Sequence, residues 1–392
     1  MIYLDNAATT KMDERILEEM LPYLTAEYGN AGTLYEFGRG ASSAVQRARN
    51  QVALFLHATP EQVIFTSGGS EANNLVFGGL KDYLKRIGKT HILVSAVEHD
   101  SVLRAAEALI KDGFDVEYIP VSRECKVYSE AVESAIRGDT GLVSVMYVNN
   151  ETGSVNPVEA IGEICARHNV LFHTDCVQAA GCQPIDVTEI GCDFASISSH
   201  KIHGGKGVGA LYVQDKSLLT PIIHGGSTQE FGLRAGTENV PGIVGFGKAC
   251  EILMLCDKYN VTDDIEYISS LRRELFQLIQ QGLASRGLPD ILHINGDSDL
   301  SKNGKILNLR FDNIDAETLL LLLDIHGVCV SAGSACNSHE QMPSHVLLAM
   351  GISEEDARNS IRLSLSRMNT EDEIKEAAKI IVDCVILLWH QS

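Results

Sequence analysis

Short apolar, β-rich runs alternate with longer amphipathic segments between about residues 60 and 215, and this alternation is the strongest constraint on the fold. Near-continuous apolar strands with helices between them are typical of a mainly parallel sheet that helices cover on both faces. The sequence therefore predicts an α/β domain here. The expected strands are residues 63–66, 91–96, 116–119, 141–148, 170–174, 194–198 and 209–213, and the expected helices are residues 71–80, 101–111, 129–136 and 158–168.

The pattern changes after the glycine-rich stretch at residues 224–247. A long charged helix is expected over 264–283, followed by strands at 305–311 and 360–365 with a leucine-rich helix over 316–326 between them, and a terminal helix over 371–389. These segments indicate a smaller α+β domain. The cleft between the two domains is the expected site.

Composition excludes several classes of protein. The 392 residues include 32 basic and 52 acidic side chains, a net charge of −20, which disfavours direct binding of nucleic acid or anionic membranes. No apolar run reaches the roughly 18 residues typical of a membrane span, and the N-terminus lacks the pattern of an export signal, so a cytoplasmic location is expected. The ten cysteines form no CxxC pair, and no metal site is expected.

Polar residues follow four successive predicted strands, where ligands of parallel sheets bind. His99, Asn150 and Asp175 come after the first three of these strands, and Ser198 to Lys201 follow the next. A single such residue would more often be structural, but this concentration indicates a site. Lys201 is the most informative, because an amine of lowered pKa can form a Schiff base.

The turn Ser67-Gly68-Gly69-Ser70-Glu71 joins a predicted strand to a predicted helix. Its glycines allow close backbone approach, and the helix N-terminus favours an anion such as phosphate. Taken alone, this motif is better explained by a tight turn with a helix cap.

An aldehyde cofactor that carries a phosphate would use both features, and pyridoxal 5'-phosphate (PLP) is such a cofactor. Asp175 is the candidate partner for its pyridinium nitrogen, although a helix cap explains this residue equally well before Lys201 is considered.

Cys336 lies among small residues in Ser331-Ala332-Gly333-Ser334-Ala335-Cys336, which favours a loop rather than a packed segment. Most other cysteines are expected to pack in the core. Cys176 and Cys329 are ambiguous, and a structural role is the simpler interpretation of both.

These motifs together resemble the group I cysteine desulfurases of NifS/IscS type, in the class V aminotransferase family, over almost the whole chain. The matching stretches are YLDNAATT, FTSGGSEANN, EHDSV, VNNETG, HTDCVQAAG, SSHKIHGGKGVGALYV, GLRAGTENV, SAGSACNS and SIRLSLSRMNTEDEI. The resemblance implies the fold type I PLP-dependent transferase architecture. It implies a large PLP-binding domain over 15–260, and a small domain of 1–14 and 261–392 that carries the cysteine loop.

The resemblance also implies conversion of L-cysteine to L-alanine by a homodimer with composite active sites. The sulfur would form a persulfide on Cys336 and pass to an acceptor protein for iron–sulfur cluster assembly or thiolation. The implied catalytic residues are Cys336 as nucleophile, Lys201 as cofactor-bound base, and His99, which stacks on the cofactor ring and assists proton transfer.

The remaining implied residues bind cofactor or substrate. Asp175 would hold the pyridinium nitrogen and Gln178 the phenolic oxygen. The expected phosphate ligands are Gly69, Ser70, Ser198 and His200, with Thr237 from the other subunit. Arg362 and Asn150 would bind the substrate carboxylate, since a guanidinium can hold it through two hydrogen bonds.

One stretch departs from the family pattern. Residues 225–232 are one residue longer than usual and carry Phe231 at an arginine position, which is expected to alter the pocket mouth or a dimer contact. Milder departures are Ser70 in place of threonine, and His203 and Gly205 in place of an aromatic residue and proline. Two alternatives therefore stay open: an aminotransferase or lyase of the same fold for which Cys336 is incidental, and a binding protein that has lost catalysis.

Overall fold

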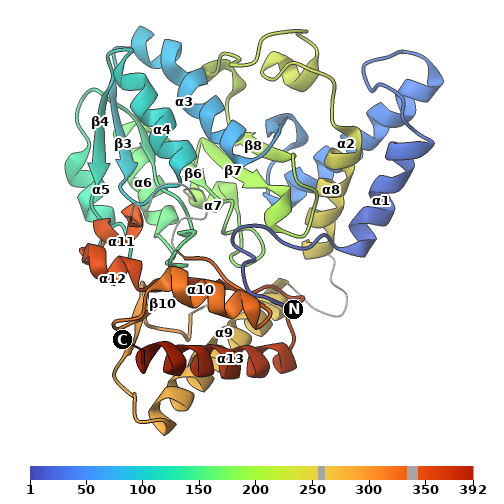
Figure 1. Ribbon diagram of the computed structural model, residues 1–392. Coiled ribbons are helices and arrows are strands. Elements are labelled where there is room, and N and C mark those ends of the chain that lie inside the picture. Colours follow the sequence, from blue (N-terminus) through green and yellow to red (C-terminus); the bar gives the residue numbers. More distant parts are fainter. Residues whose placement is uncertain (255–260, 303, 333–342, 392) are drawn as a thin grey trace.

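The computed structural model describes residues 1–254, 261–302, 304–332 and 343–391. They form a mixed α/β molecule with a large sheet in the upper part of Figure 1 and a smaller helix-covered sheet below it. The fold class expected from the sequence is confirmed.

Seven strands form the large sheet in the order β2-β8-β7-β6-β5-β3-β4. Strand β8 is antiparallel to both of its neighbours, and the other pairings are parallel, which confirms a mainly parallel sheet. The strands are β2 (Val63–Thr66), β3 (His91–Ser95), β4 (Asp115–Ile119), β5 (Thr140–Ser144), β6 (Leu171–Asp175), β7 (Phe194–Ser198) and β8 (Gly209–Val213). The strand expected over 141–148 is wrong at its end, because regular β5 stops at Ser144.

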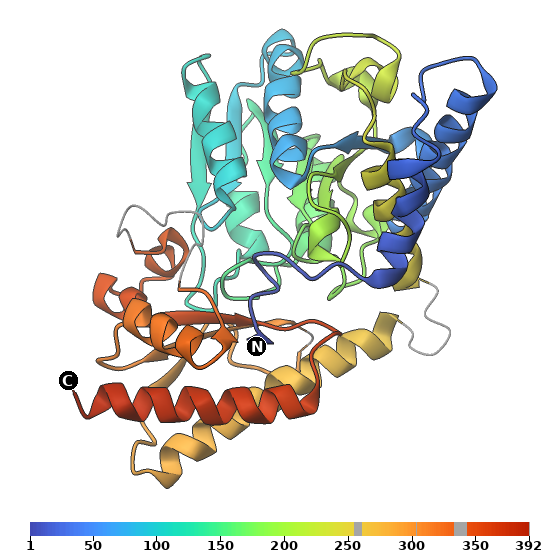
Figure 2. The ribbon, with the colours of Figure 1, turned by 45° about the vertical axis from the view of Figure 1, so that its right-hand side comes forward.

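The two faces of this sheet are buried against different helices because side chains alternate along each strand. In β2, Val63 and Phe65 pack in one apolar cluster and Ile64 packs in another. The first cluster involves α2 (Glu36–Phe55), α6 (Val158–His168), α7 (Val187–Ile190) and α8 (Val240–Met254), and the second involves α3 (Gly69–Arg86) and α4 (Asp100–Ile110). Figure 2 shows helices on both sides of the sheet.

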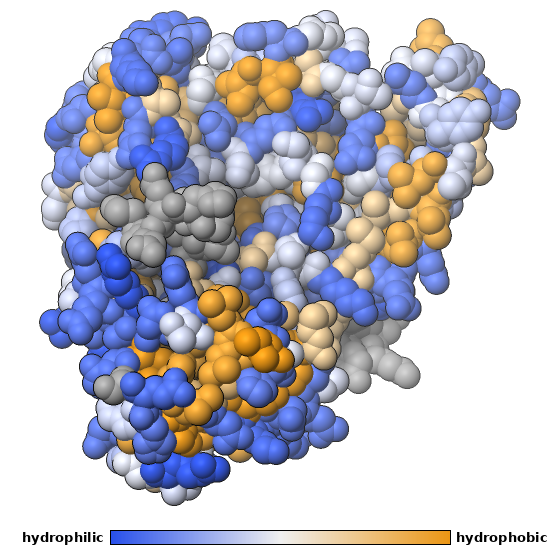
Figure 3. Space-filling view, in the orientation of Figure 1, coloured by the Kyte–Doolittle hydropathy of each residue, from blue (hydrophilic) through white to orange (hydrophobic). Residues whose placement is uncertain are grey.

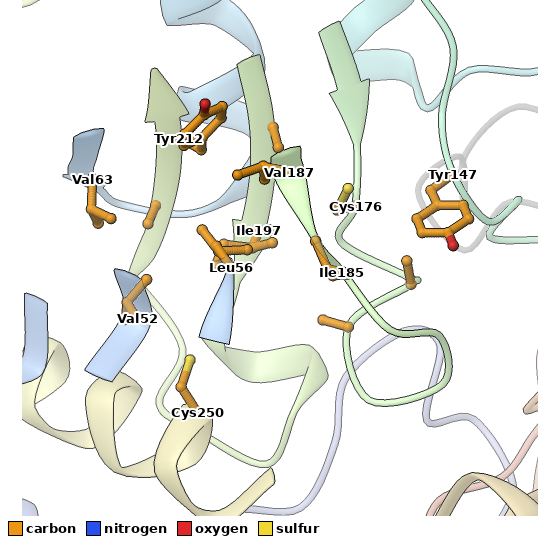
Figure 4. Packing of buried hydrophobic residues seen from close by; sticks show 14 of the residues in the cluster. Val52, Leu56, Val63, Tyr147, Cys176, Ile185, Val187, Ile197, Tyr212 and Cys250 are labelled. Carbon is orange, nitrogen blue, oxygen red and sulfur yellow. The ribbon is translucent and has the colours of Figure 1, made fainter. Parts of the chain in front are cut away.

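Cysteines contribute to this core as apolar side chains. Cys176 and Cys250 lie among Leu56, Ile197 and other residues of the first cluster in Figure 4. Burial raises the pKa of the Cys165 thiol to about 12 and that of Cys176 well above its ordinary value. These thiols are therefore unreactive, as expected; Cys256 lies outside the described residues.

The lower part is built on a three-stranded antiparallel sheet in the order β12-β10-β9. Its strands are β9 (Leu292–Asn295), β10 (Ile306–Phe311) and β12 (Ser360–Ser364), and its main helices are α9 (Val261–Ser285), α10 (Ala316–Ile325) and α13 (Glu371–Trp389). Smaller elements are α5 (Ser129–Ala135) in the upper part and α11 (His345–Ala349) and α12 (Glu354–Arg358) near the junction.

The first residues join this lower part. Strand β1 (Ile2–Tyr3) pairs with β11 (Val328–Cys329), and Asp5 bridges to Ser364. Residues 6–10 then cross the junction, and α1 (Glu14–Thr25) lies beside α8. The exact domain boundaries stay a prediction.

Among the described residues, no helix combines the length and apolarity that crossing a membrane requires.

Candidate active site

Four neighbouring strands bring the expected site residues to one edge of the large sheet. Strands β3, β5, β6 and β7 are adjacent in the sheet and parallel, so their carboxyl ends meet. His99 caps α4 just after β3, Asp175 ends β6, and Ser198 ends β7. Lys201 follows in the short 3₁₀ turn Ser199–Lys201.

Lys201 is held at the junction between the two parts of the molecule. Its Nζ donates hydrogen bonds to the carbonyl oxygens of Ala7, at 2.5 Å, and Ala8, at 2.9 Å, on the crossing segment. Burial, together with the cations of Lys305 and Arg362 and against the opposite effect of Asp175 and Asp5, lowers the pKa of this lysine to about 8. Lys201 therefore loses its proton far more readily than an exposed lysine, and its uncharged form is a nucleophilic amine.

Asp175 is 4% exposed and fixed by two donors. The Nδ2 atom of Asn73 donates to Oδ2 of Asp175 at 2.8 Å, and the backbone N–H of Val177 donates to Oδ1 at 2.9 Å. A carboxylate oriented this way can hold a protonated ring nitrogen.

Several buried polar atoms around Lys201 have no partner among the described residues. They include Oγ of Ser198, Oε1 of Gln178 and Oδ1 of Asn150. Buried polar atoms are normally paired, so their clustering indicates a polar ligand. Gln178 is itself oriented, because its Nε2 donates to the Ala7 carbonyl at 2.9 Å. The chemistry of these groups fits PLP.

The turn of residues 67–71, here called the phosphate turn, is closely packed beneath this site. Gly68 has a φ of +154°, and a Cβ added at Gly69 would come within 2.7 Å of the Val177 side chain. Ser70 is exposed at the start of α3, where its hydroxyl is accessible to an anion. The Glu71 carboxylate accepts hydrogen bonds from the Ser67 backbone N–H of the turn, at 2.8 Å, and from Arg234 Nε, at 3.0 Å.

Both histidines of the site are held by neighbouring residues. Nδ1 of His99 accepts a hydrogen bond from the Ser101 backbone N–H, so the neutral ring carries its proton on Nε2. His200 is 3.1 Å from the Thr9 hydroxyl through Nδ1, and burial lowers its pKa to about 4. His200 is therefore neutral.

Arg362 and Asn150 lie together on the opposite wall. One Nη of Arg362 donates to the backbone carbonyl of Asn150 at 3.0 Å, and the other donates to Asp5 at 2.9 Å. Nε of Arg362 has no partner in the described part of the chain. The guanidinium is thus oriented and keeps a free donor.

Cys336 lies outside the described residues, but the chain on either side of it is anchored at this site. Ser331 and Arg362 exchange two backbone hydrogen bonds, at 3.1 and 2.7 Å. On the other side, Ser344 Oγ donates to the Glu151 carboxylate at 2.5 Å. Residues 331 and 344 are therefore both hydrogen-bonded to the wall of the site that contains Arg362 and Asn150.

Thr237, expected to serve the other subunit, is exposed. Its neighbours Gly236 and Glu238 line a small cavity with Ser67, Gly207 and Arg234, next to the phosphate turn. Its role in the other subunit stays a prediction.

Residues 225–232 contain an ion pair that the sequence analysis did not identify. Glu230 and Phe231 both have left-handed φ angles, of 42° and 59°. The buried Glu230 carboxylate pairs with Arg49 at 2.6 Å and accepts from the Phe65 backbone N–H at 2.7 Å. Phe231 is 47% exposed, and Lys216 Nζ lies 3.6 Å from its ring centroid. Here the departure from the family pattern forms an exposed cation–π contact.

Comparison with known proteins agrees with this geometry. Residues 2–376 match the family described as aminotransferase class V. The chain belongs to this family of PLP-dependent enzymes. It is 43% identical over 381 residues to a cysteine desulfurase IscS of Clostridium botulinum, covering 97% of this chain and 93% of that protein.

Solved structures give the same relationship. A NifS-like protein superposes with a TM-score of 0.88 at 35% identity, covering 98% of this chain and 99% of the other. A structure described as SspA in complex with cysteine has a TM-score of 0.78 at 34% identity, covering 94% and 100%. Within the class V family, the chain therefore belongs to the cysteine desulfurases.

Proposed function

We propose that this protein is a PLP-dependent cysteine desulfurase that converts L-cysteine to L-alanine and transfers the sulfur to Cys336. The observation that carries this proposal is the placement of Lys201, with its lowered pKa, among the oriented carboxylate of Asp175 and the unpartnered polar atoms of Ser198 and Gln178. Membership of the cysteine desulfurases supports the substrate.

Each of the site residues has a defined part in this proposal. Lys201 holds the cofactor aldehyde, Asp175 the ring nitrogen and Gln178 the phenolic oxygen. The phosphate is bound by Gly69, Ser70, Ser198 and His200, with Thr237 from a second subunit. When bound, PLP supplies a ring that accepts the electron pair released at the substrate α-carbon.

The walls of the site position the substrate and move its protons. Arg362 offers its free Nε–H and the side chain of Asn150 its unpartnered Oδ1 toward an amino acid. Lys201, whose pKa is lowered to about 8, accepts the α-proton in its uncharged form, and His99 releases or accepts a proton at Nε2. The Cys336 thiolate then attacks the substrate sulfur: an S–S bond forms, the carbon–sulfur bond breaks, and its electron pair goes to the substrate carbon, which takes up a proton on the way to alanine.

The sulfur acceptor and the assembly are further parts of the proposal. We infer a homodimer whose sites include Thr237 of the second chain, and an acceptor protein for iron–sulfur cluster assembly or thiolation. A cytoplasmic location stays a prediction.

The test is incubation of the purified protein with L-cysteine, followed by mass measurement of the Cys336 peptide and assay of alanine. The expected result is a gain of one sulfur atom on Cys336. Cys336→Ser should keep the absorbance band of lysine-bound PLP, near about 400–430 nm, but form no persulfide. Lys201→Ala should lose that band and about 10²- to 10⁴-fold in alanine formation.

Cys329→Ser is the matched control, because Cys329 ends β11 only a few residues before Cys336. It should form persulfide normally. Transamination that persists unchanged in Cys336→Ser, without desulfuration in the unsubstituted protein, would instead identify an aminotransferase of this fold.

A further inference from the structure

A second lysine lies beside Lys201. Lys305 comes just before β10 and is only 5% exposed. Its backbone carbonyl accepts from the Leu365 N–H at 2.8 Å, which fixes it to the end of β12. Its side chain reaches toward the large part of the molecule, where Nζ donates a long hydrogen bond of 3.4 Å to the Ala180 carbonyl.

Lys201 and Lys305 line the same small cavity at the junction of the two parts. Its other polar lining residues are Asn6, Thr10, His203, Asp264, Ser366 and Arg367. The two lysines therefore face a shared, narrow space in which water screens charges less than at the surface.

The charge of Lys305 is not compensated as those of its neighbours are. Arg362 pairs with Asp5 at 2.9 Å, and Arg367 pairs with Asp13 at 2.7 Å. No described carboxylate forms an ion pair with Lys305, and its Nζ donates to a neutral carbonyl. Burial lowers the pKa of Lys305, and among the described groups the Cys182 thiol is the one that acts in the opposite direction.

We propose that Lys305 is a positioning residue for Lys201: its buried ammonium group disfavours a second positive charge in the cavity and so favours the uncharged form of the Lys201 amine. With PLP present, this uncharged amine would attack the aldehyde carbon, a carbon–nitrogen double bond would replace the carbon–oxygen bond, and the oxygen would leave as water. The inference rests on the proposed role of Lys201 in binding PLP.

The electrostatic surroundings of Lys201 agree with this assignment. After burial, Lys305 is the largest contributor that lowers the pKa of Lys201, ahead of Arg362. Asp175 and Asp5 act in the opposite direction. Asp5 is already paired with Arg362, and the Asp175 carboxylate is directed at Asn73 and Val177, so neither neutralises Lys305. His200 and His203 also lie near Lys201, and burial lowers the pKa of each to about 4, so they carry no charge near neutral pH.

The test is a pH titration of the PLP–lysine absorbance band in the holoenzyme. Without the Lys305 charge, the nitrogen of Lys201 keeps its proton to higher pH. Lys305→Met should therefore raise the midpoint of the titration by about one pH unit, the order of shift that a nearby buried charge produces. Lys305→Arg, which keeps the charge, should stay close to the original midpoint.

Lys302→Met is the matched control, since it removes a lysine charge three residues away that is 53% exposed and paired with Asp297. Its midpoint should not move. Lys305→Gln provides a second neutral variant if Lys305→Met folds poorly.

An unchanged midpoint in both neutral Lys305 variants, or an equal rise in Lys302→Met, would overturn the inference alone. Failure of the unsubstituted protein to form the band would overturn the proposed function, and this inference with it.

Discussion

At the scale of single residues, the site contains a carboxyl group that cannot easily ionise. Glu98 is fully buried one residue before His99. It accepts a hydrogen bond from the Met146 backbone N–H, but its Oε2 has no partner in the described part of the chain. Burial raises its pKa well above the ordinary value, and the nearby Asp175 carboxylate raises it further. Glu98 is therefore expected to stay protonated and leave Asp175 as the anion of the site.

This argument predicts a pH-dependent stability. Because the folded-state pKa is above the unfolded one, the contribution of Glu98 is fully present below about pH 4.5 and is lost as pH rises through the folded pKa. Glu98→Gln should match the unsubstituted protein in urea unfolding at low pH and exceed it increasingly toward alkaline pH. Glu61→Gln, which removes an exposed carboxylate, is the control; parallel curves for the protein and Glu98→Gln would show that Glu98 is ionised when folded.

The site residues that directly follow predicted strands lie together in the structure. The sequence pattern does not predict the residues that support them through contacts with distant segments. Lys201 and Asp175 follow apolar runs, and the structure places both at the expected edge. Asn73 supports Asp175 from 102 positions away, and Lys305 approaches Lys201 from the other sheet. Helical or strand periodicity cannot reveal such pairs, because neither residue departs from the pattern of its own segment.

At the scale of elements, the phosphate turn depends on the packing of β8 beneath it. A Cβ added at Gly209 would lie 2.7 Å from both Gly68 Cα and the Ile197 carbonyl oxygen. All of these neighbours are backbone atoms, which cannot move aside as a flexible side chain can. Gly209 in β8 therefore allows the phosphate turn to lie close against the sheet.

Gly209→Ala should therefore destabilise the protein by about 1–3 kcal/mol, the usual range for overpacking. It should also weaken PLP binding, because the added methyl displaces the turn that carries Gly69 and Ser70. Thermal unfolding and titration of the apoprotein with PLP measure the two effects.

Gly40→Ala is the control substitution, since nothing lies within 4 Å of its added Cβ in helix α2. It should leave PLP affinity unchanged and raise stability by about 0.5–1 kcal/mol. Equal PLP affinities for Gly209→Ala and the unsubstituted protein would show that the packing of β8 does not affect the phosphate site.

Elements with a clear period are predicted well, and elements without one are not. The strands β2, β7 and β8 and helices α6 and α13 have the expected bounds. The sequence pattern does not predict helix α8, whose first half lies in the glycine-rich stretch, because the helix is buried on most sides and lacks an amphipathic stripe. The reversed direction of β8 could not be predicted either, since an apolar strand has the same sequence pattern in both orientations.

At the scale of the whole molecule, apolar side chains are exposed on several separate surfaces. Figure 3 shows one over α1, at the right-hand edge, and another over α10, below the centre. The segment that links α1 to α2 adds Tyr28, Leu34 and Tyr35, which are 74%, 90% and 59% exposed. Exposed apolar patches of this kind mark interaction sites, and the proposed homodimer requires one.

We expect the contact between subunits to form on the apolar surface of α1 and of the segment that links it to α2. This surface adjoins α8, and α8 follows directly after the exposed Thr237 and the cavity beside the phosphate turn. A second chain bound there can bring its own Thr237 to the neighbouring site. Leu34→Asp combined with Tyr28→Asp should convert dimers to monomers in sedimentation equilibrium. It should also lower PLP affinity, because each site then loses the partner's contribution. Leu321→Asp on α10, where Leu321 is 63% exposed, should change neither property, and a monomeric unsubstituted protein with full PLP affinity would refute the shared site.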